Sequence, residues 1–245
     1  MTVFVTGGSR GIGRAIVLKF VEEGHDVAFT YVANEIAARE TIELASGLGS
    51  GQVRSYRLDV KSSKEVEEVV ERALDDFETI DALVNNAAIV RNNATVLMSD
   101  EEWDDVLATN LSGPFFMARQ FLMHFLSNRG GRIVNISSIA QGGSSGQVNY
   151  AASKAGLAGL TKTLAREYGP KGITSNAVVL GLVHTDMTDE HLDERLAPFW
   201  NQWCPRKRVG TAEEAASLVY YLCSDQADFI NGELIHLSGG LTHAP

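Results

Sequence analysis

The sequence predicts an α/β fold built on a doubly wound parallel sheet, in which helices cover both faces and form a three-layer sandwich. Apolar runs of strand length alternate with helical patterns almost from end to end, and this alternation is typical of βαβ units. The strand runs are continuously apolar, which indicates that neither face of the sheet is open to water. No linker or internal repeat interrupts the pattern, so we expect residues 1–245 to form a single domain.

Seven apolar runs are the strand candidates, and they cover residues 3–6, 27–31, 53–58, 82–85, 132–137, 174–179 and 233–237. Residues 64–77 carry apolar side chains at helical spacing, and Ser62 or Ser63 can cap this helix. A second helix is expected over residues 100–126, because its acidic first turn suits the helix dipole. Pro114 predicts a kink within that helix.

Two further helices are expected, one over residues 150–168 and one over residues 212–223, where Thr211 can act as the N-cap. Residues 184–205 differ from the rest of the chain, because they are polar, acidic and aromatic with weak periodicity. We expect this segment to be a substrate lid.

The composition is that of an ordinary globular protein, with 44% hydrophobic and 21% charged residues. A net charge of −10 argues against a nucleic-acid partner, which requires a basic face. The first residues show no leader pattern and no apolar run is long enough to span a membrane, so we expect a cytoplasmic chain. Cys204 and Cys223 are expected to be free thiols. His184 and His191 lack a third ligand at suitable spacing, so no metal site is expected.

A glycine-rich segment, TGGSRGIG, follows the first apolar run directly, and a helical pattern that Gly24 ends comes after it. Gly7, Gly11 and Gly13 let the backbone turn tightly, approach a pyrophosphate and pack the helix against the sheet. The amino terminus of the helix then faces the anion. The strand before and the helix after favour a dinucleotide-binding turn of the Rossmann type over an ordinary tight turn.

The cofactor preference depends on the end of the second strand, where an NAD site usually places an acidic side chain. Tyr31 and Val32 stand there instead, so no carboxylate repels a 2′-phosphate. Arg10, inside the glycine turn, can meet that phosphate with a charge-assisted contact, the alternative being a solvated loop residue. We therefore expect NADP(H) as the cofactor.

Tyr150 and Lys154 stand four residues apart at the start of a helical run, so they share one face. An ammonium near a phenol favours the phenolate, which predicts a lowered pKa for Tyr150 and a role in proton transfer. Ser137 or Ser138, at the end of the preceding strand, can hydrogen-bond a substrate oxygen, and the match of NISSIA to the strand end favours Ser138. Asn110, with its amide oxygen turned inward, can hold a water near Lys154.

Several motifs occur in a fixed order, namely TGGSRGIG, LDV at 58–60, NNAA at 85–88, Asn110, NISS at 135–138, YAASK at 150–154 and a terminal SGG. Together they make the chain resemble the short-chain dehydrogenase/reductase family over essentially its whole length. Within the family it is most similar to β-ketoacyl-acyl-carrier-protein reductases, on the segments DEEWDDVLATNLSGPF, GQVNYAASKAGLAGLTKTLAREYGPKGITSNAV and HTDMT.

The resemblance implies a catalytic set of four residues. Tyr150 is implied as the general acid/base, Ser138 as the substrate-orienting hydroxyl and Asn110 as the water-holding residue. Lys154, the fourth, is implied to contact the nicotinamide ribose as well.

The resemblance also implies a set of cofactor contacts, which are Gly7, Ser9, Arg10, Gly11, Ile12, Gly13, Asp59, Val60, Asn86, Ala87, Tyr150, Lys154 and Thr185. Within this set, Asp59 and Val60 are implied to border the adenine. Asn86 and Ala87 are implied to border the adenosine ribose and the central sheet, and Thr185 the carboxamide.

For the reaction, the resemblance implies NADPH-dependent reduction of a 3-oxoacyl thioester to the 3-hydroxyacyl form, in fatty-acid or polyketide-type biosynthesis. The resemblance implies that the substrate is attached to an acyl carrier protein, which is acidic and would bind Arg129 and Lys171. Both residues can also be ordinary surface charges. A homotetramer is implied, paired through the two long helices. Their apolar residues include Phe115, Phe116, Phe121, Leu122 and Phe125.

Two other functions stay open, which are a dehydrogenase of a free small alcohol, sugar or steroid and an inactive cofactor-binding partner subunit of a hetero-oligomer. The intact Ser, Tyr, Lys and Asn set argues against the inactive subunit. The chain departs from the family pattern at Ala88 and Leu180, where glycine and proline are usual, and in a serine-to-tyrosine loop that is one residue shorter. Phe199, Trp200 and Trp203 form either an aromatic substrate wall or apolar packing.

Overall fold

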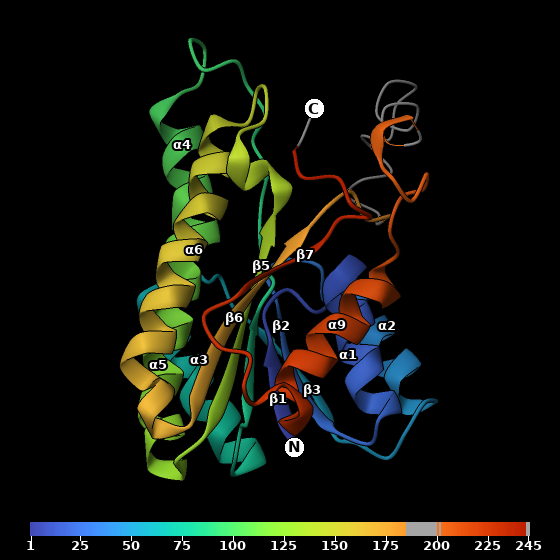
Figure 1. Ribbon diagram of the computed structural model, residues 1–245. Coiled ribbons are helices and arrows are strands. Elements are labelled where there is room, and N and C mark those ends of the chain that lie inside the picture. Colours follow the sequence, from blue (N-terminus) through green and yellow to red (C-terminus); the bar gives the residue numbers. More distant parts are fainter. Residues whose placement is uncertain (185–199, 201, 244–245) are drawn as a thin grey trace.

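A seven-stranded parallel sheet forms the centre of the protein, and its strand order is β3-β2-β1-β4-β5-β6-β7 (Figure 1). The strands are β1 (Thr2–Val5), β2 (Asp26–Tyr31), β3 (Val53–Arg57), β4 (Ala82–Asn85), β5 (Gly131–Ser138), β6 (Ile173–Leu180) and β7 (Leu234–Leu237). The computed structural model describes residues 1–184, 200 and 202–243. Every strand overlaps its predicted run, and no end is displaced by more than one residue. The predicted doubly wound parallel sheet is therefore confirmed.

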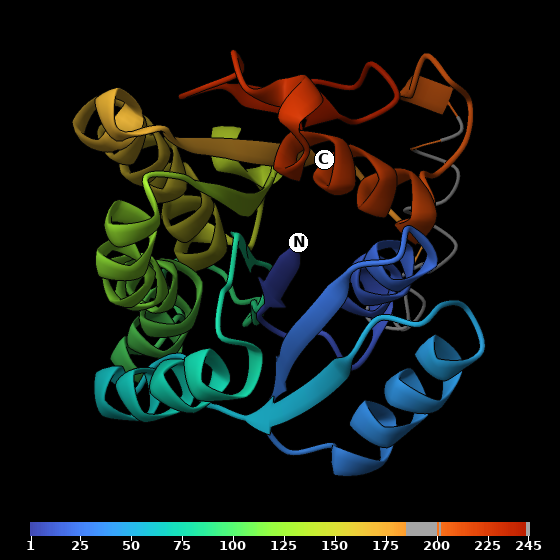
Figure 2. The same ribbon diagram turned by 90° about the horizontal axis from the view of Figure 1, so that it is seen from below.

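Helices cover both faces of the sheet, as Figure 2 shows from below. One layer holds α1 (Gly11–Glu22), α2 (Glu35–Ser46) and α9 (Ala212–Cys223). The other layer holds α3 (Ser63–Phe77), α4 (Asp100–Leu107), α5 (Gly113–Asn128) and α6 (Val148–Tyr168). Each layer buries its own apolar cluster against the sheet, with Phe20 and Phe29 in the first and Phe4 and Phe121 in the second. This burial is the main source of stability for such a sandwich.

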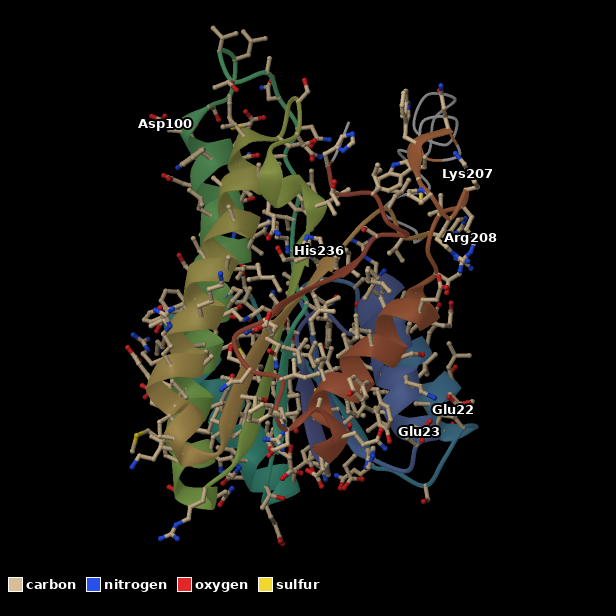
Figure 3. The ribbon with its side chains drawn as sticks, viewed as in Figure 1. Glu22, Glu23, Asp100, Lys207, Arg208 and His236 are labelled. Atoms are coloured by element: carbon tan, nitrogen blue, oxygen red, sulfur yellow. The ribbon has the colours of Figure 1, made fainter. Side chains whose placement is uncertain are left out.

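The strand order reverses between β1 and β4, because β2 lies on one side of β1 and β4 on the other. In open parallel sheets, ligands bind outside the carboxyl ends of the strands at such a reversal. Asp100 lies at this end of the molecule, whereas Glu22 and Glu23 lie at the opposite end (Figure 3). The glycine turn after β1 therefore stands where the topology favours a ligand.

The helix caps follow the sequence closely. Ser62, rather than Ser63, caps α3 by accepting a hydrogen bond from the Glu65 N–H. Thr211 caps α9 as predicted and forms a reciprocal capping box with Glu214. Helix α6 begins at Val148, two residues earlier than predicted, which places the tyrosine of the YxxxK pair within its first turn.

The kink predicted at Pro114 is a π-helical segment, Ala108–Ser112, which joins α4 to α5. In a regular helix Pro114 would have no N–H for the carbonyl of Asn110, and its ring would clash with that group. The backbone widens instead, and the N–H of Gly113 bonds the carbonyl of Ala108. The distortion thus lies just before the proline, at a residue assigned to the site.

The predicted lid, residues 184–205, lies mostly outside the described residues, and so do Thr185, His191 and Phe199. Trp200 is 3% exposed and packs in a cluster with Cys204, as the apolar-packing alternative predicts, whereas Trp203 is 57% exposed. Cys204 and Cys223 are free and buried. Among the residues that the structure describes, none of the helices has the length and apolarity to cross a membrane.

Candidate active site

The turn between β1 and α1 has the geometry of a phosphate-binding loop. Gly7 and Gly11 hold positive φ angles of 68° and 54°, which other residues adopt only under strain. A Cβ atom on Gly13 would lie against the carbonyl oxygen of Gly7, closer than two such atoms can approach. The two ends of the turn are therefore packed backbone on backbone, and only glycine fits at residue 13.

Two polar side chains hold this turn in place, from Thr6 directly after β1 and from Asn86 directly after the neighbouring strand β4. The Thr6 Oγ1 accepts hydrogen bonds from the N–H groups of Asn86 (2.9 Å) and Ala87 (3.0 Å). The Asn86 amide donates in return to the carbonyls of Thr6 (3.0 Å) and Gly7 (3.1 Å). The structure therefore shows Asn86 fixing the glycine turn, a role that sequence reasoning did not assign to it or to Thr6.

The amino terminus of α1 suits an anionic ligand. Its N-cap residue is Arg10, whose side chain makes no capping hydrogen bond, and no acidic residue stands in the first turn. The N–H groups at a helix start have no partner within the helix, so a pyrophosphate can accept from them. Together with the glycine packing, these features fit the dinucleotide that the fold implies.

A second guanidinium, from the neighbouring strand β3, contacts the end of β2, and sequence reasoning missed it. Arg57, at the end of β3, pairs in register with Tyr31, and its Nε donates a 3.2 Å hydrogen bond to the carbonyl of Val32. The turn that follows β2 therefore faces a cation in place of the carboxylate usual in NAD sites. The sequence signal was a lone basic residue two positions before Asp59 in the LDV motif.

The next turn, after β3, holds the two residues expected at the adenine. Val60 is buried and Asp59 is part of a charge network with Lys61, whose Nζ lies 3.7 Å from the Asp59 carboxylate. The same Nζ lies 2.7 Å from the Asp105 carboxylate on α4. This ion pair links the turn after β3 to α4.

Tyr150, Ser138 and Lys154 converge where β5 ends against the first turns of α6. Ser138 is the last residue of β5, and its side chain lies close enough to the Tyr150 hydroxyl to lower the pKa of that phenol. The Lys154 Nζ lies 5.6 Å from the centre of the Tyr150 ring and donates a 2.7 Å hydrogen bond to the Ile136 carbonyl. The structure thus brings together three of the four predicted catalytic residues.

Burial sets the ionisation of this pair, and one sequence-based expectation was wrong. Burial raises the pKa of the Tyr150 phenol, and the nearby Ser138 side chain offsets this only in part. Burial also lowers the pKa of Lys154 to about 8. The expected lowering of the Tyr150 pKa by the ammonium does not prevail, because removing the phenolate from water disfavours it more strongly.

The choice between the two serines follows from their surroundings. Ser137 is 2% exposed, and its single O–H lies within hydrogen-bond distance of two acceptors, the Gln141 Oε1 (3.0 Å) and the Lys154 carbonyl (3.2 Å). Ser138 instead lies beside the Tyr150 hydroxyl. The geometry therefore favours Ser138 as the serine that meets a substrate oxygen.

Asn110 is fully buried within the π-helical segment, but its side chain is engaged elsewhere than predicted. Its Oδ1 accepts from the Ile89 N–H and its Nδ2 donates to the Ile89 carbonyl, both at 2.9 Å. A second contact, at 3.3 Å, joins Nδ2 to the hydroxyl of Ser153. The group left without its α-helical donor is the backbone carbonyl of Asn110, because Pro114 has no N–H.

Arg129 and Lys171 lie on one exposed corner at the amino ends of the strands. Arg129 caps α5 and Lys171 follows α6, and a Cβ on Gly172 would lie 2.8 Å from the Arg129 carbonyl. Helix α6 holds 21 residues and so separates Lys171 from Tyr150 by about 30 Å. The two basic residues are together, yet far from the Tyr150 of the same chain.

Taken together, a dinucleotide-binding Rossmann-type sheet and a Ser, Tyr and Lys constellation at its carboxyl edge define a nicotinamide-dependent oxidoreductase. The family profile described as enoyl-(acyl carrier protein) reductase matches residues 7–242. The chain belongs to the short-chain dehydrogenase/reductase family.

The similar curated proteins include several named 3-oxoacyl-[acyl-carrier-protein] reductase FabG. The one from Staphylococcus epidermidis is 40% identical over 243 residues, which are 98% of this chain and 98% of the relative. The one from Salmonella typhimurium is 41% identical over 238 residues, covering 97% and 95%. The crystal structure of levodione reductase is similar as well, with a TM-score of 0.94, 32% identity, and coverage of 98% and 96%.

Proposed function

We propose that this protein reduces a 3-oxoacyl group, held as a thioester on an acyl carrier protein, to the 3-hydroxyacyl form with NADPH, in fatty-acid or polyketide-type biosynthesis. The observation that carries the proposal is the placement of the Tyr150 phenol beside Ser138 and over the buried Lys154 ammonium. The phenol must be protonated to serve as an acid, and its raised pKa keeps it so at neutral pH. The names of the similar reductases support the substrate class.

Each residue of the constellation then has a role in reducing the ketone. The nicotinamide supplies the hydride when bound. The Ser138 hydroxyl orients the substrate oxygen, and Tyr150 donates its proton to that oxygen as charge develops on it. Lys154 contacts the nicotinamide ribose, and Asn110 holds the water of the proton path through its backbone carbonyl.

NADPH is proposed over NADH because of the charges around the adenosine end of the site. No acidic side chain stands at Tyr31 or Val32, where β2 ends. Two guanidinium groups lie nearby in the chain's fold, from Arg10 in the glycine turn and from Arg57 at the end of β3, which bonds the Val32 carbonyl. A guanidinium binds a phosphate through charge-assisted hydrogen bonds, which a ribose hydroxyl does not match. Comparable kcat/KM values with NADH and NADPH would overturn this part of the proposal.

Docking of the carrier is proposed at the exposed corner of Arg129 and Lys171. The protein carries a net charge of −10, so an acidic partner needs a local basic surface. Because this corner is about 30 Å along α6 from Tyr150, docking there serves the active site of a second copy packed along the helices. The proposed assembly is a homotetramer, and within it the docking corner of one copy would serve the active site of a neighbouring copy.

The test is NADPH oxidation by the purified chain against a panel of substrates. We expect turnover of 3-oxoacyl thioesters, and a lower KM for the carrier-bound form than for the same acyl group on a small thiol. Charge reversal at Arg129 and Lys171 is expected to raise the KM for the carrier-bound form alone. Turnover confined to free ketones would contradict the proposed substrate.

A second candidate, reduction of a free small ketone or oxidation of a free alcohol, is favoured by the similarity to levodione reductase. The same panel decides between the two. Thioesters and free ketones are compared at equal concentrations, and the higher kcat/KM identifies the substrate class. Absence of turnover with every member would favour a third possibility, an inactive partner subunit.

A further inference from the structure

Asn149, the residue before Tyr150, is fully buried and has an amide hydrogen-bonded on both sides. Its Oδ1 accepts a 2.7 Å hydrogen bond from the Tyr150 N–H. Its Nδ2 donates two hydrogen bonds of 3.1 Å, to the carbonyls of Arg91 and Glu102. All three partners are backbone groups, so the bonds fix the course of the chain rather than the rotamer of another side chain.

The three partners belong to three different segments. Arg91 lies in the loop after β4, Glu102 in the first turn of α4 and Tyr150 in the first turn of α6. Figure 1 shows α4 and the start of α6 side by side at the upper end of the molecule, in agreement with their bonds. One amide therefore joins the start of α6 to two elements that come more than 40 residues earlier in the sequence.

The first turn of α6 has no side-chain cap of its own, since the Gln147 side chain bonds the Asn92 side chain instead, at 2.9 Å. The N-cap residue is Gln147, whose side chain makes no capping bond, and no acidic residue stands in the turn. The N–H of Tyr150 has no acceptor within the helix, because the first four such groups of any helix lack one. Asn149 supplies that acceptor and also bonds the turn to α4. It therefore restricts the motion of the Tyr150 backbone.

We propose that Asn149 is a positioning residue, which holds the first turn of α6 so that the hydroxyl of Tyr150 stays against Ser138. The inference rests on the proposed function through the acid role of Tyr150. Asn149 itself touches no reacting atom. Its contribution is geometric, and a misplacement of about 1 Å in a reacting group can lower a rate about 100-fold.

Asn176 offers a matched control. It is another fully buried asparagine, and its amide also joins two backbone groups, donating to the Ile230 carbonyl (2.7 Å) and accepting from the Glu233 N–H (3.1 Å). Its partners lie before β7, away from Tyr150. Asn149→Ala and Asn176→Ala thus remove comparable bonds, and only the former changes the support of the phenol.

The experiment measures three properties of both variants, namely NADPH affinity, steady-state kinetics and amide hydrogen exchange of the peptide that spans residues 148–154. We expect Asn149→Ala to bind NADPH within about two-fold of the wild type while kcat falls about 10- to 100-fold. Exchange in the peptide is expected to accelerate. Asn176→Ala is expected to lower the melting temperature while leaving kcat and the exchange of that peptide unchanged.

The pH profile separates positioning from a general loss of stability. The reduction rate should fall at alkaline pH, where Tyr150 loses the proton that it donates. Interaction with Ser138 lowers the pKa of Tyr150, so a weaker interaction raises this pKa and moves the fall in rate to higher pH. Substitution of a residue with a purely structural role would leave the pH of this fall in rate unchanged. Asn149→Asp, which keeps the acceptor but loses both donors, is measured in the same way in case the alanine variant does not fold.

The proposal is overturned if the folded Asn149 variants keep the wild-type kcat and the wild-type pH of the fall in rate, or if Asn176→Ala lowers kcat by the same factor. Failure of the proposed function gives a different result. In that case the wild type reduces no acyl thioester, and hydrogen exchange alone decides the positioning role, with unchanged exchange in the Asn149 variants refuting it.

Discussion

The Lys154 ammonium lies over the ring of Tyr150 rather than at its hydroxyl, with Nζ 5.6 Å from the ring centre and 2.7 Å from the Ile136 carbonyl. The four-residue spacing puts both side chains on one helix face, yet the lysine is anchored to the backbone of β5. Its position is therefore set by the sheet, and the phenol is free to act as an acid whose pKa burial raises.

The first prediction concerns Tyr150→Phe. The substitution removes only the hydroxyl, so we expect kcat to fall by about 100- to 10,000-fold, the usual contribution of a general acid. NADPH affinity, measured by fluorescence, is expected to change little. Tyr168→Phe, at the opposite end of α6, is the control and should keep wild-type turnover. Normal turnover by a Tyr150→Phe protein that still binds NADPH would refute the mechanism.

The second prediction concerns the buried ammonium of Lys154. Burial lowers the pKa of Lys154 to about 8 from an unfolded value of 10.5. Between these two pKa values the unfolded chain binds more protons than the folded chain, so the free energy of unfolding should rise with pH across this window. Below pH 8 the folded protein must bury a charged ammonium, which lowers the free energy of unfolding. This reduction is about 3 kcal/mol at neutral pH.

Lys154→Met keeps the length of the side chain and removes the charge. The lost hydrogen bond from the ammonium to Ile136 costs about 1.5–3 kcal/mol, so we expect a net gain of about 0–1.5 kcal/mol at pH 7, together with loss of activity. The gain should shrink as pH approaches 10, measured by urea unfolding. Lys162→Met, at an exposed lysine of the same helix, should show no such trend. A pH-independent difference would contradict this account.

The elements of the fold could be predicted from the sequence because their signals are local. Strand runs, the glycine turn and the Thr211 cap depend on residues that are close together along the chain. The π-helical segment could be foreseen only as a kink, since Pro114 shows that a bond is lost but not how the backbone absorbs the loss.

The details of the site could not be predicted, because they depend on contacts between distant segments. The burial that raises the pKa of Tyr150 is a tertiary property, and the bond from Asn149 to Arg91 joins residues 58 apart. The apolar stripe of α5 shows the same limit. Phe121, Leu122 and Phe125 are buried within the chain itself, so they do not contribute to a subunit contact as the sequence suggested.

The third prediction concerns cofactor selectivity. Arg10→Ala removes a guanidinium from the start of α1, and we expect the Kd for NADPH to rise about 10-fold, since a charge-assisted hydrogen bond contributes about 1.5–3 kcal/mol. The Kd for NADH should stay nearly constant, because NADH has no 2′-phosphate. Arg39→Ala, on the exposed surface of α2, is the control for general loss of positive charge. Equal weakening of both cofactors would show that Arg10 does not distinguish them.

The fourth prediction concerns assembly through α5. Phe115 and Met123 remain exposed on this helix, at 44% and 71%, and the Arg119 guanidinium lies 5.2 Å from the centre of the Phe115 ring. Such an apolar strip with a stacked arginine is typical of a subunit contact. We expect Met123→Glu to reduce the molar mass measured by light scattering, because it buries an unpaired carboxylate in the interface.

Leu44→Glu is the matched control for this test. Leu44 is 50% exposed on α2, in the opposite helical layer, so the same change of charge should leave the molar mass unaltered. A wild-type chain that is monomeric at micromolar concentration would refute the assembly outright. If both variants dissociate alike, the added charge rather than contact through α5 controls the assembly. That result would also contradict the proposal that a carrier docked at the Arg129 corner delivers its substrate to a second copy.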